Sequence, residues 1–164
     1  YLMRTDGSDV RRLTGDQGDV SLYPSWSPDG ASIAYMNLTG AGCIHVIDVE
    51  SPEEPVNLTP EIGVSAWSPK WSPDGKYITF MGSGSDKKDV YRMDADGSNL
   101  VNLTADWPAY CVDPTWSPDG KWILFSSRRD GNDTFTLYVM RPDGSQLARV
   151  LTTTAWDVEA DWGP

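Results

Sequence analysis

The pentapeptide Trp-Ser-Pro-Asp-Gly occurs three times in this chain of 164 residues, at 26–30, 71–75 and 116–120. Each copy begins 45 residues after the one before it. A fixed period of this length indicates that one supersecondary unit is repeated along the chain. Such a unit buries its apolar face against its own neighbours, which restricts the fold to architectures that stack equivalent units.

Each repeat carries the pattern of four short β-strands. Runs that alternate apolar with polar residues follow the pentapeptides, as "ASIAYMN", "KYITFMG" and "KWILFSS". A second run ends in an Asp-Gly turn at 6–7, 96–97 and 143–144, and a short strand ending in "VNLT" or "RVLT" closes the unit. Within the pentapeptide, Pro sets φ, Asp can bond the backbone two residues on, and Gly takes positive φ, so this segment is expected to be a tight turn.

Antiparallel four-strand units of roughly 40–50 residues are typical of β-propeller blades. We therefore predict an all-β propeller arc with three complete blades and a partial blade at each end. The predicted divisions are 1–14 for the last two strands of one blade, 15–59, 60–104 and 105–152 for the complete blades, and 153–164 for the start of a further blade. The repeated tryptophans would fill the gaps between neighbouring sheets and the repeated aspartates would shape turns: Trp26, Trp71, Trp116, Asp29, Asp74 and Asp119.

The repeats also resemble a known family. The segments "YPSWSPDGASIAYMN", "PKWSPDGKYITFMG" and "DPTWSPDGKWILFSSRRDGNDTFTLYVMRPDGS" are similar to the blades of TolB-type propellers, relatives of the WD-type repeat. The resemblance covers the whole chain, although the first complete unit has "DVESPEEPV" in place of the second Asp-Gly turn. It implies a periplasmic or secreted protein that binds other proteins at the mouth of the propeller channel.

The resemblance further implies a ring with more blades than this chain supplies. We therefore expect an open arc, either part of a larger propeller or a piece completed by a partner chain. Exposed strand edges and Trp-rich blade faces at the ends of such an arc would favour self-association.

Charge and composition exclude several classes of partner. The net charge of −11 argues against nucleic acid, because backbone phosphates require clustered Lys and Arg. The acidic surface favours solubility and a basic partner, although it is also what an ordinary solvated face looks like. No apolar run is long enough to span a membrane. Cys43 and Cys111 have no zinc-type spacing and fall two blades apart, so we expect two free thiols.

Each candidate catalytic or metal-binding group in the sequence is better explained by a structural role. The single histidine, His45, occupies the strand position where other blades carry tyrosine, so we interpret it as structural. The segment "DADGSN" at 94–99 lacks the glycine and glutamate spacing of a calcium loop. We therefore expect no catalytic residue, no metal site and no cofactor in this chain.

Four Asn-x-Thr sequons occur, at Asn37, Asn57, Asn102 and Asn132. Asn57 and Asn102 belong to the repeated "NLT" that ends a blade, so repetition explains those two. Glycosylation depends on a secretory host and stays open.

The connections between consecutive blades do not repeat: "GDQGDVSLY", "PEIGVSAWSPK", "ADWPAYCVDP" and "TTAWDVEAD". In a propeller these loops surround the channel mouth. Aromatic side chains interleaved with acids suit recognition of a polypeptide, or stacking on sugar rings, although the tryptophans would also suit packing between blades. We predict six partner-binding residues on this face, with Trp107 and Tyr110 as the principal pair: Trp67, Trp107, Tyr110, Trp156, Asp106 and Asp113.

The sequence thus favours a non-catalytic module for binding or assembly, with a protein or glycan partner. Two alternatives stay open. The chain could be the propeller of a larger secreted enzyme, such as a peptidase of the prolyl oligopeptidase type, whose chemistry would lie mostly outside it. It could also be a self-assembling structural protein joined through its open blade ends.

Overall fold

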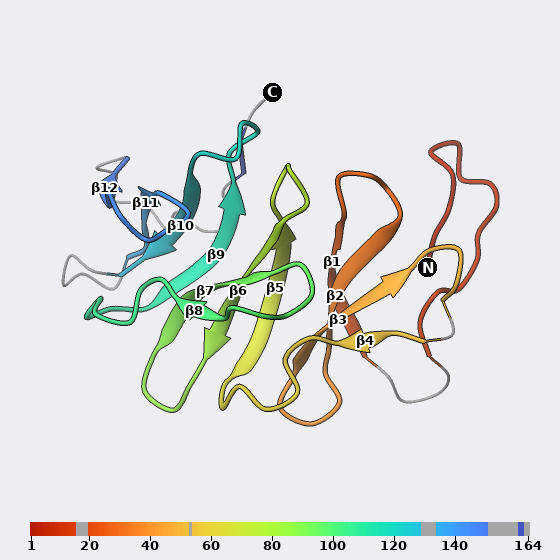
Figure 1. The fold of residues 1–164 in the computed structure, drawn as a ribbon, viewed down its shortest axis with the longest axis horizontal. Coiled ribbons are helices and arrows are strands. Elements are labelled where there is room, and N and C mark those ends of the chain that lie inside the picture. The colour runs from red at the N-terminus through yellow and green to blue at the C-terminus, as the bar shows by residue number, and fades with distance from the viewer. Residues whose placement is uncertain (16–19, 53, 129–133, 151–160, 163–164) are drawn as a thin grey trace.

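In the computed structural model the described residues are 1–15, 20–52, 54–128, 134–150 and 161–162. These ranges contain twelve β-strands and no helix, and the strands form three antiparallel sheets of four strands each (Figure 1). The predicted all-β propeller arc of four-stranded blades is confirmed.

Every sheet is built from four strands that are consecutive in the chain. The first sheet has the order β1 (Ser21–Trp26), β2 (Ser32–Asn37), β3 (Cys43–Asp48) and β4 (Val56–Asn57). The second has β5 (Ser65–Trp71), β6 (Tyr77–Ser83), β7 (Lys88–Asp94) and β8 (Val101–Asn102). The third has β9 (Cys111–Trp116), β10 (Ile123–Ser127), β11 (Thr136–Met140) and β12 (Ala148–Arg149).

The pentapeptide turn between the first two strands of each sheet is held by a recurring hydrogen-bond network. In the first sheet the Ser27 hydroxyl donates to Asp29 Oδ1 over 2.6 Å, and the backbone N–H of Ala31 donates to the same oxygen over 3.0 Å. The N–H of Ser32 donates to Ser27 Oγ over 2.9 Å. The same bonds recur around Asp74 and Asp119, and the turn glycines have positive φ of 73°, 72° and 68° at Gly30, Gly75 and Gly120.

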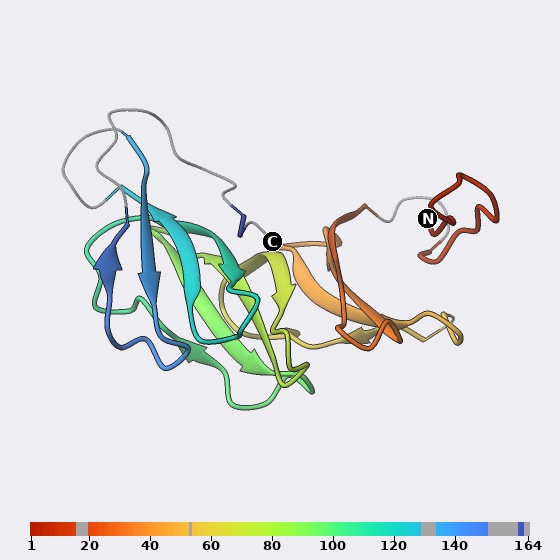
Figure 2. The same cartoon turned by 90° about the horizontal axis from the view of Figure 1, so that it is seen from above.

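The sheets stack through their immediate neighbours. Strand β5 packs against β1, β2 and β3, and β9 packs against β5, β6 and β7. Seen from above, the three sheets follow one another along an arc (Figure 2). Strands β1, β5 and β9 are each the edge strand of their own sheet, and β5 contacts both of the others, so these three form the inner side of the arc.

Residues 1–15 cover the outer face of the first sheet. Leu2 and Leu13 pack against Ile33, Tyr35 and Ile47. The two strands expected here are reduced to a single bridge between Leu2 and Arg11 around the Asp-Gly turn. Of the further blade expected at 153–164, only 161–162 lie inside the described residues. The exact blade divisions stay a prediction.

Cys43 and Cys111 are free thiols on different sheets. Burial raises the pKa of the Cys111 thiol to about 11. Within the described ranges, no helix is long and apolar enough to cross a membrane.

Candidate functional site

An open groove of about 720 Å³ runs along the inner side of the arc. All three sheets contribute to it, with most of the wall coming from β5 and β9. The lining residues are Tyr23, Trp67, Ser68, Lys70, Met81, Ser83, Lys88, Val112, Asp113, Pro114, Thr115, Phe135 and Asp161.

The apolar wall of the groove lies across the junction of the second and third sheets. Trp67 on β5 packs against Met81, Val112 and Phe135, which form a small cluster separate from the main layers between the sheets. Tyr23 on β1 extends this wall toward the first sheet, with its ring centre 6.4 Å from that of Trp67 and an angle of 60° between the rings. The first two sheets therefore each supply one aromatic side chain to the groove, and Phe135 supplies a third from the residue that precedes β11 (Thr136–Met140).

Charged groups of both signs accompany the aromatic wall. Lys70 and Lys88 line the groove from the second sheet, and Asp113 lines it from β9. Asp161 accepts a hydrogen bond of 3.3 Å from the Thr115 hydroxyl. Because lysines and carboxylates are mixed, the groove is suited neither to a simple anion nor to a simple cation.

Each inner strand is interrupted at the groove by the same β-bulge. Two residues of the inner strand lie opposite one aromatic residue of the next strand, which is Tyr35, Phe80 or Phe125. The first residue of each bulge has positive φ, namely 53° at Tyr23, 51° at Ser68 and 53° at Asp113, and the second is proline. Left-handed backbone at a residue that bears a Cβ costs roughly 1–2 kcal/mol. All three of these costly residues line the groove.

Tyr110 is not among the lining residues of the groove, but Arg128 links it to the groove wall. The Tyr110 side chain is 41% exposed. The Arg128 guanidinium stands 5.9 Å from the centre of the Tyr110 ring and 4.6 Å from the centre of the Phe135 ring. The backbone N–H of Arg128 donates to the Tyr110 carbonyl over 3.2 Å. Arg128 therefore joins the predicted loop aromatic to an aromatic of the groove wall.

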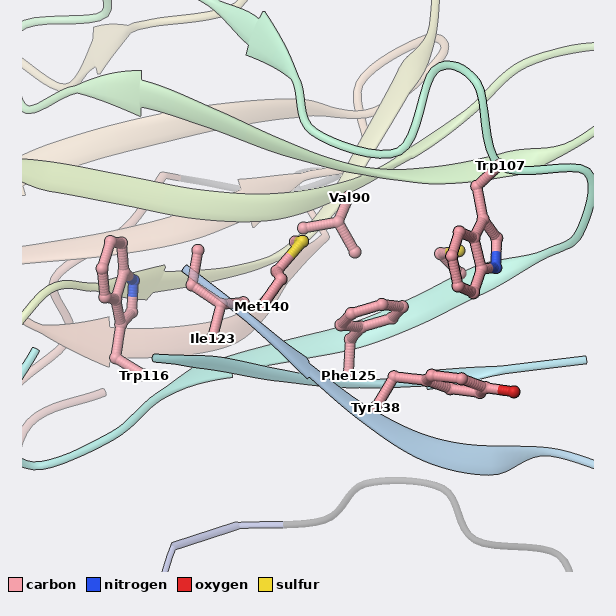
Figure 3. Packing of buried hydrophobic residues seen from close by; sticks show 8 residues of the cluster. Val90, Trp107, Trp116, Ile123, Phe125, Tyr138 and Met140 are labelled. Atoms are coloured by element: carbon pink, nitrogen blue, oxygen red, sulfur yellow. The ribbon is translucent and has the colours of Figure 1, made fainter. Parts of the chain in front are cut away.

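The structure places Trp107, the other member of the predicted pair, in the core, and its partner-binding role stays a prediction. Its side chain is only 9% exposed, and the indole N–H donates to Ser127 Oγ over 3.0 Å. Its ring meets Tyr138 edge-on, with centres 5.4 Å apart. Figure 3 shows Trp107 and Trp116 at opposite ends of one packed layer between the second and third sheets. Trp107 is buried because Ser127 satisfies its N–H while the large ring fills the end of this layer.

A partly buried ion pair holds the loop that carries Trp107. The Lys87 ammonium donates to the carbonyl oxygens of Thr104, Ala105 and Trp107 over 3.3, 2.7 and 3.2 Å. It also pairs with Asp89 Oδ1 at 3.1 Å, and the Thr104 hydroxyl donates to the same carboxylate oxygen over 2.9 Å. The start of this loop is therefore fixed on the second sheet while its indole is fixed on the third.

The other predicted partner-binding residues divide three ways. Trp67 and Asp113 line the groove. Asp106 is exposed on the loop but is not among the lining residues. Trp156 lies outside the described residues.

Sequence reasoning missed several members of the groove: Tyr23, Ser68, Lys70, Lys88 and Phe135. One signal was available. The repeat begins before the pentapeptide, as x-Pro-x-Trp, and the variable first position of this longer motif is the bulge residue that lines the groove.

The repeated tryptophans lie at equivalent positions in unequal surroundings. Trp116 is 7% exposed and stacks on Tyr77 of the preceding sheet, with ring centres 6.2 Å apart. Trp71 is partly buried against the layer between the first and second sheets. Trp26 is 47% exposed.

The repeated aspartates lie in the turns and are not among the groove residues. The hydrogen bond from the Ser117 hydroxyl, with further help from the Lys121 N–H, lowers the pKa of Asp119 to about 2. The bonds from Ser27 and Ser72 lower the pKa values of Asp29 and Asp74 in the same way.

Three of the sequons have a local structural use. The side-chain oxygens of Asn37, Asn57 and Asn102 each accept the N–H of the threonine two residues on, over 2.8, 2.9 and 3.0 Å. Asn132 lies outside the described residues. His45 lies on β3 with its ring centre 5.7 Å from that of Tyr35. Among the described residues, no group of three or more His, Cys, Asp or Glu side chains is arranged to hold a metal ion.

Comparison with protein families gives a match over the whole length. The model of the TolB beta propeller domain matches residues 1–164. The chain belongs to this family. A search of curated proteins finds no match.

Solved structures share the fold of this TolB-type propeller. TolB from Acinetobacter baumannii is 25% identical, with a TM-score of 0.76 over 95% of this chain and 38% of that protein. A protein described as TolB from Agrobacterium tumefaciens is 24% identical, with a TM-score of 0.71 over 84% of this chain and 50% of that protein. An oligogalacturonate lyase from Vibrio parahaemolyticus is 17% identical, with a TM-score of 0.65 over 84% of this chain and 43% of that protein. The chain spans half or less of the length of these proteins.

Proposed function

We propose that this TolB-type propeller is a non-catalytic binding module whose inner groove holds a segment of a partner polypeptide. The observation that carries the proposal is the composition of the groove. Three aromatic side chains, those of Tyr23, Trp67 and Phe135, lie in the same groove as two lysines and two aspartates. Aromatic anchors with charged neighbours are typical of protein-binding sites.

The dimensions and charges of the groove support a polypeptide over other ligands. Its volume of about 720 Å³ is enough for several side chains of an extended segment. The aromatic wall suits an apolar side chain, and Lys70, Lys88 and Asp113 suit neighbours of both charge signs. Nucleic acid is disfavoured by the net charge of −11, because its phosphates would face a predominantly acidic protein.

The location of the protein follows the same family argument. We propose a periplasmic or extracellular site of action, supported by the resemblance to TolB propellers. Fractionation of cells that express the complete gene would test this, and recovery in the cytoplasm alone would overturn it.

The binding function can be tested with a peptide library, which requires no named partner. Random peptides displayed on phage are selected on the immobilised chain, and the enriched peptides are titrated calorimetrically. In the test variant Lys70→Ala/Lys88→Ala, affinity should fall at least about tenfold. The matched control is Lys76→Ala/Lys121→Ala, because these lysines pair with the turn aspartates Asp74 and Asp119. Failure to enrich any peptide, or equal losses in the two double variants, would refute the proposal.

One observation favours a second candidate, self-association. Several apolar side chains are exposed on and beside the N-terminal segment: Tyr1 at 84%, Met3 at 65%, Val10 at 62% and Trp26 at 47%. These exposed side chains would favour contact between copies where they adjoin one another. Analytical ultracentrifugation at rising concentration would show dimers that Trp26→Ser weakens; a monomer at all concentrations would exclude this candidate.

A further inference from the structure

The inner strands offer one obvious mode of peptide binding, which is pairing along an exposed strand edge. Strands β1, β5 and β9 are each the edge strand of their sheet, and all three contribute to the groove. An edge strand presents unpaired N–H and C=O groups to which a partner strand can add. The chemistry of these edges decides whether this mode is available.

The β-bulges prevent a partner strand from pairing along these edges. The bulges at Tyr23, Ser68 and Asp113 fall within strands of six, seven and six residues, so only short regular stretches remain on either side. The following residue is proline each time, which has no N–H to donate. A bulge also twists an edge away from a flat partner strand. None of the three inner strands therefore presents a continuous row of donors and acceptors.

The identity of the bulge residues points to a second role. Glycine adopts positive φ without strain, yet these positions hold tyrosine, serine and aspartate. Among the described residues, the other non-glycine residues with positive φ are Asp9, Asn99 and Gln146, each two residues after the glycine of an Asp-Gly turn. Their side chains bond to Arg4, Asp94 and Arg141 over 2.7, 2.8 and 3.0 Å. The bulge residues differ in position, since all three line the groove.

We propose that Tyr23, Ser68 and Asp113 are the specificity-determining residues of the groove, and that it binds its polypeptide through side chains without adding a strand to any sheet. This inference rests on the proposed function. The β-bulge recurs in all three sheets, whereas the side chain of its first residue changes along the arc, from an aromatic ring to a hydroxyl to a carboxylate. The favoured partner is an extended segment with an apolar side chain opposite Tyr23 and Trp67, and a hydroxyl or basic side chain opposite Asp113.

Backbone methylation of the ligand tests the mode of binding. A peptide selected from the displayed library is synthesised with single N-methyl groups at successive positions, and separately with single alanine substitutions. Side-chain recognition predicts that at least one alanine substitution lowers affinity about tenfold or more, while most N-methyl groups change it less than about threefold. Large losses at every second N-methyl position would show strand addition and overturn the inference while leaving the proposed function standing. A library that yields no binding peptide would overturn both.

Glycine substitution tests the specificity-determining residues. Tyr23→Gly and Ser68→Gly remove the side chain at a backbone angle that glycine prefers, so the melting temperature should be unchanged or higher. Affinity for the selected peptides should fall at least about tenfold in Tyr23→Gly and change measurably in Ser68→Gly. The matched controls are Asp9→Gly and Asn99→Gly. They remove a side chain at a similar positive φ outside the groove, and these variants should bind the peptides normally.

Normal binding by Tyr23→Gly and Ser68→Gly would overturn the assignment. If a glycine variant fails to fold, re-selection of the library on Asp113→Ser gives an independent answer. A changed side-chain preference at one peptide position supports the inference, and an unchanged consensus refutes it.

Discussion

Because Trp107 is buried, its substitution is expected to lower the stability of the fold, and this loss can be measured separately from any change in binding. Trp107→Ala removes an indole that is 91% buried, since its side chain is 9% exposed. A tryptophan buries roughly 150–250 Å², which at about 25 cal/mol per Å² sets an upper bound of roughly 4–6 kcal/mol. Core substitutions of this kind cost about 3–5 kcal/mol in practice. We expect the free energy of unfolding to fall by about 4 kcal/mol.

A graded series sharpens this test. Trp107→Phe keeps most of the ring contacts but removes the indole N–H that donates to the buried Ser127 hydroxyl, which leaves only the weak Cys111 thiol donor there, so about 1–3 kcal/mol should be lost. Tyr110→Ala, on the same loop but 41% exposed, should cost less than about 1 kcal/mol. Urea unfolding followed by far-UV circular dichroism measures all three. If Trp107→Ala lowers the free energy of unfolding no more than Tyr110→Ala does, the indole is not part of the core. The prediction that Trp107 is an accessible partner-binding residue would then stand.

Three further predictions concern residues of the repeat and the two thiols. Trp116→Ala should lower the free energy of unfolding by about 3–5 kcal/mol and Trp26→Ala by less than about 2, because Trp116 is 7% exposed and Trp26 is 47% exposed. Equal losses in urea melts would contradict the conclusion that Trp116 stabilises the packing between sheets. Asp119 has its pKa lowered from 3.8 to about 2 in the fold, so its contribution to stability is present above about pH 4 and lost as pH falls toward 2. The melting temperature of Asp119→Asn should therefore vary less than that of the parent across that window, and parallel curves would count against the turn. At pH 8 a thiol reagent should modify Cys43 quickly and Cys111 only on unfolding, since burial raises the pKa of Cys111 to about 11; simultaneous modification would show that the third sheet opens readily.

The fold was predictable because its defining interactions are local in sequence. The Ser27–Asp29 pair, the Ala31 N–H and the positive φ of Gly30 all lie within five residues of one another, and the serine, aspartate and glycine recur in the other two repeats. The strand-forming runs that follow the turn then supply the second strand of each sheet, and β2, β6 and β10 are buried along nearly their whole length. Once local chemistry specifies the turn and the alternation specifies the strand, a period of 45 residues leaves few architectures.

The candidate site was predictable only in part, because burial depends on distant partners. Trp67 and Asp113 were identified from their place in the non-repeating connections, and they line the groove. Trp107 met the same criterion, yet its acceptor Ser127 lies 20 residues later on a different strand. Tyr23 ends the first of these connections but was not selected, because nothing in the sequence shows that the β-bulge at this position faces the groove.

The neighbour-to-neighbour stacking of the sheets has a consequence for cooperativity. Only the second sheet is packed on both faces by other four-stranded sheets among the described residues, so opening of the first or third removes a single such interface. Stability in such an array behaves as a chain of nearest-neighbour couplings, and its ends open most easily. A ligand bound as proposed in the groove would touch all three sheets at once and would therefore add a coupling between the first and the third. Occupancy should slow amide hydrogen exchange in β3 and β11, although the ligand lies against the inner strands, because local opening of either end sheet would require the ligand to leave first.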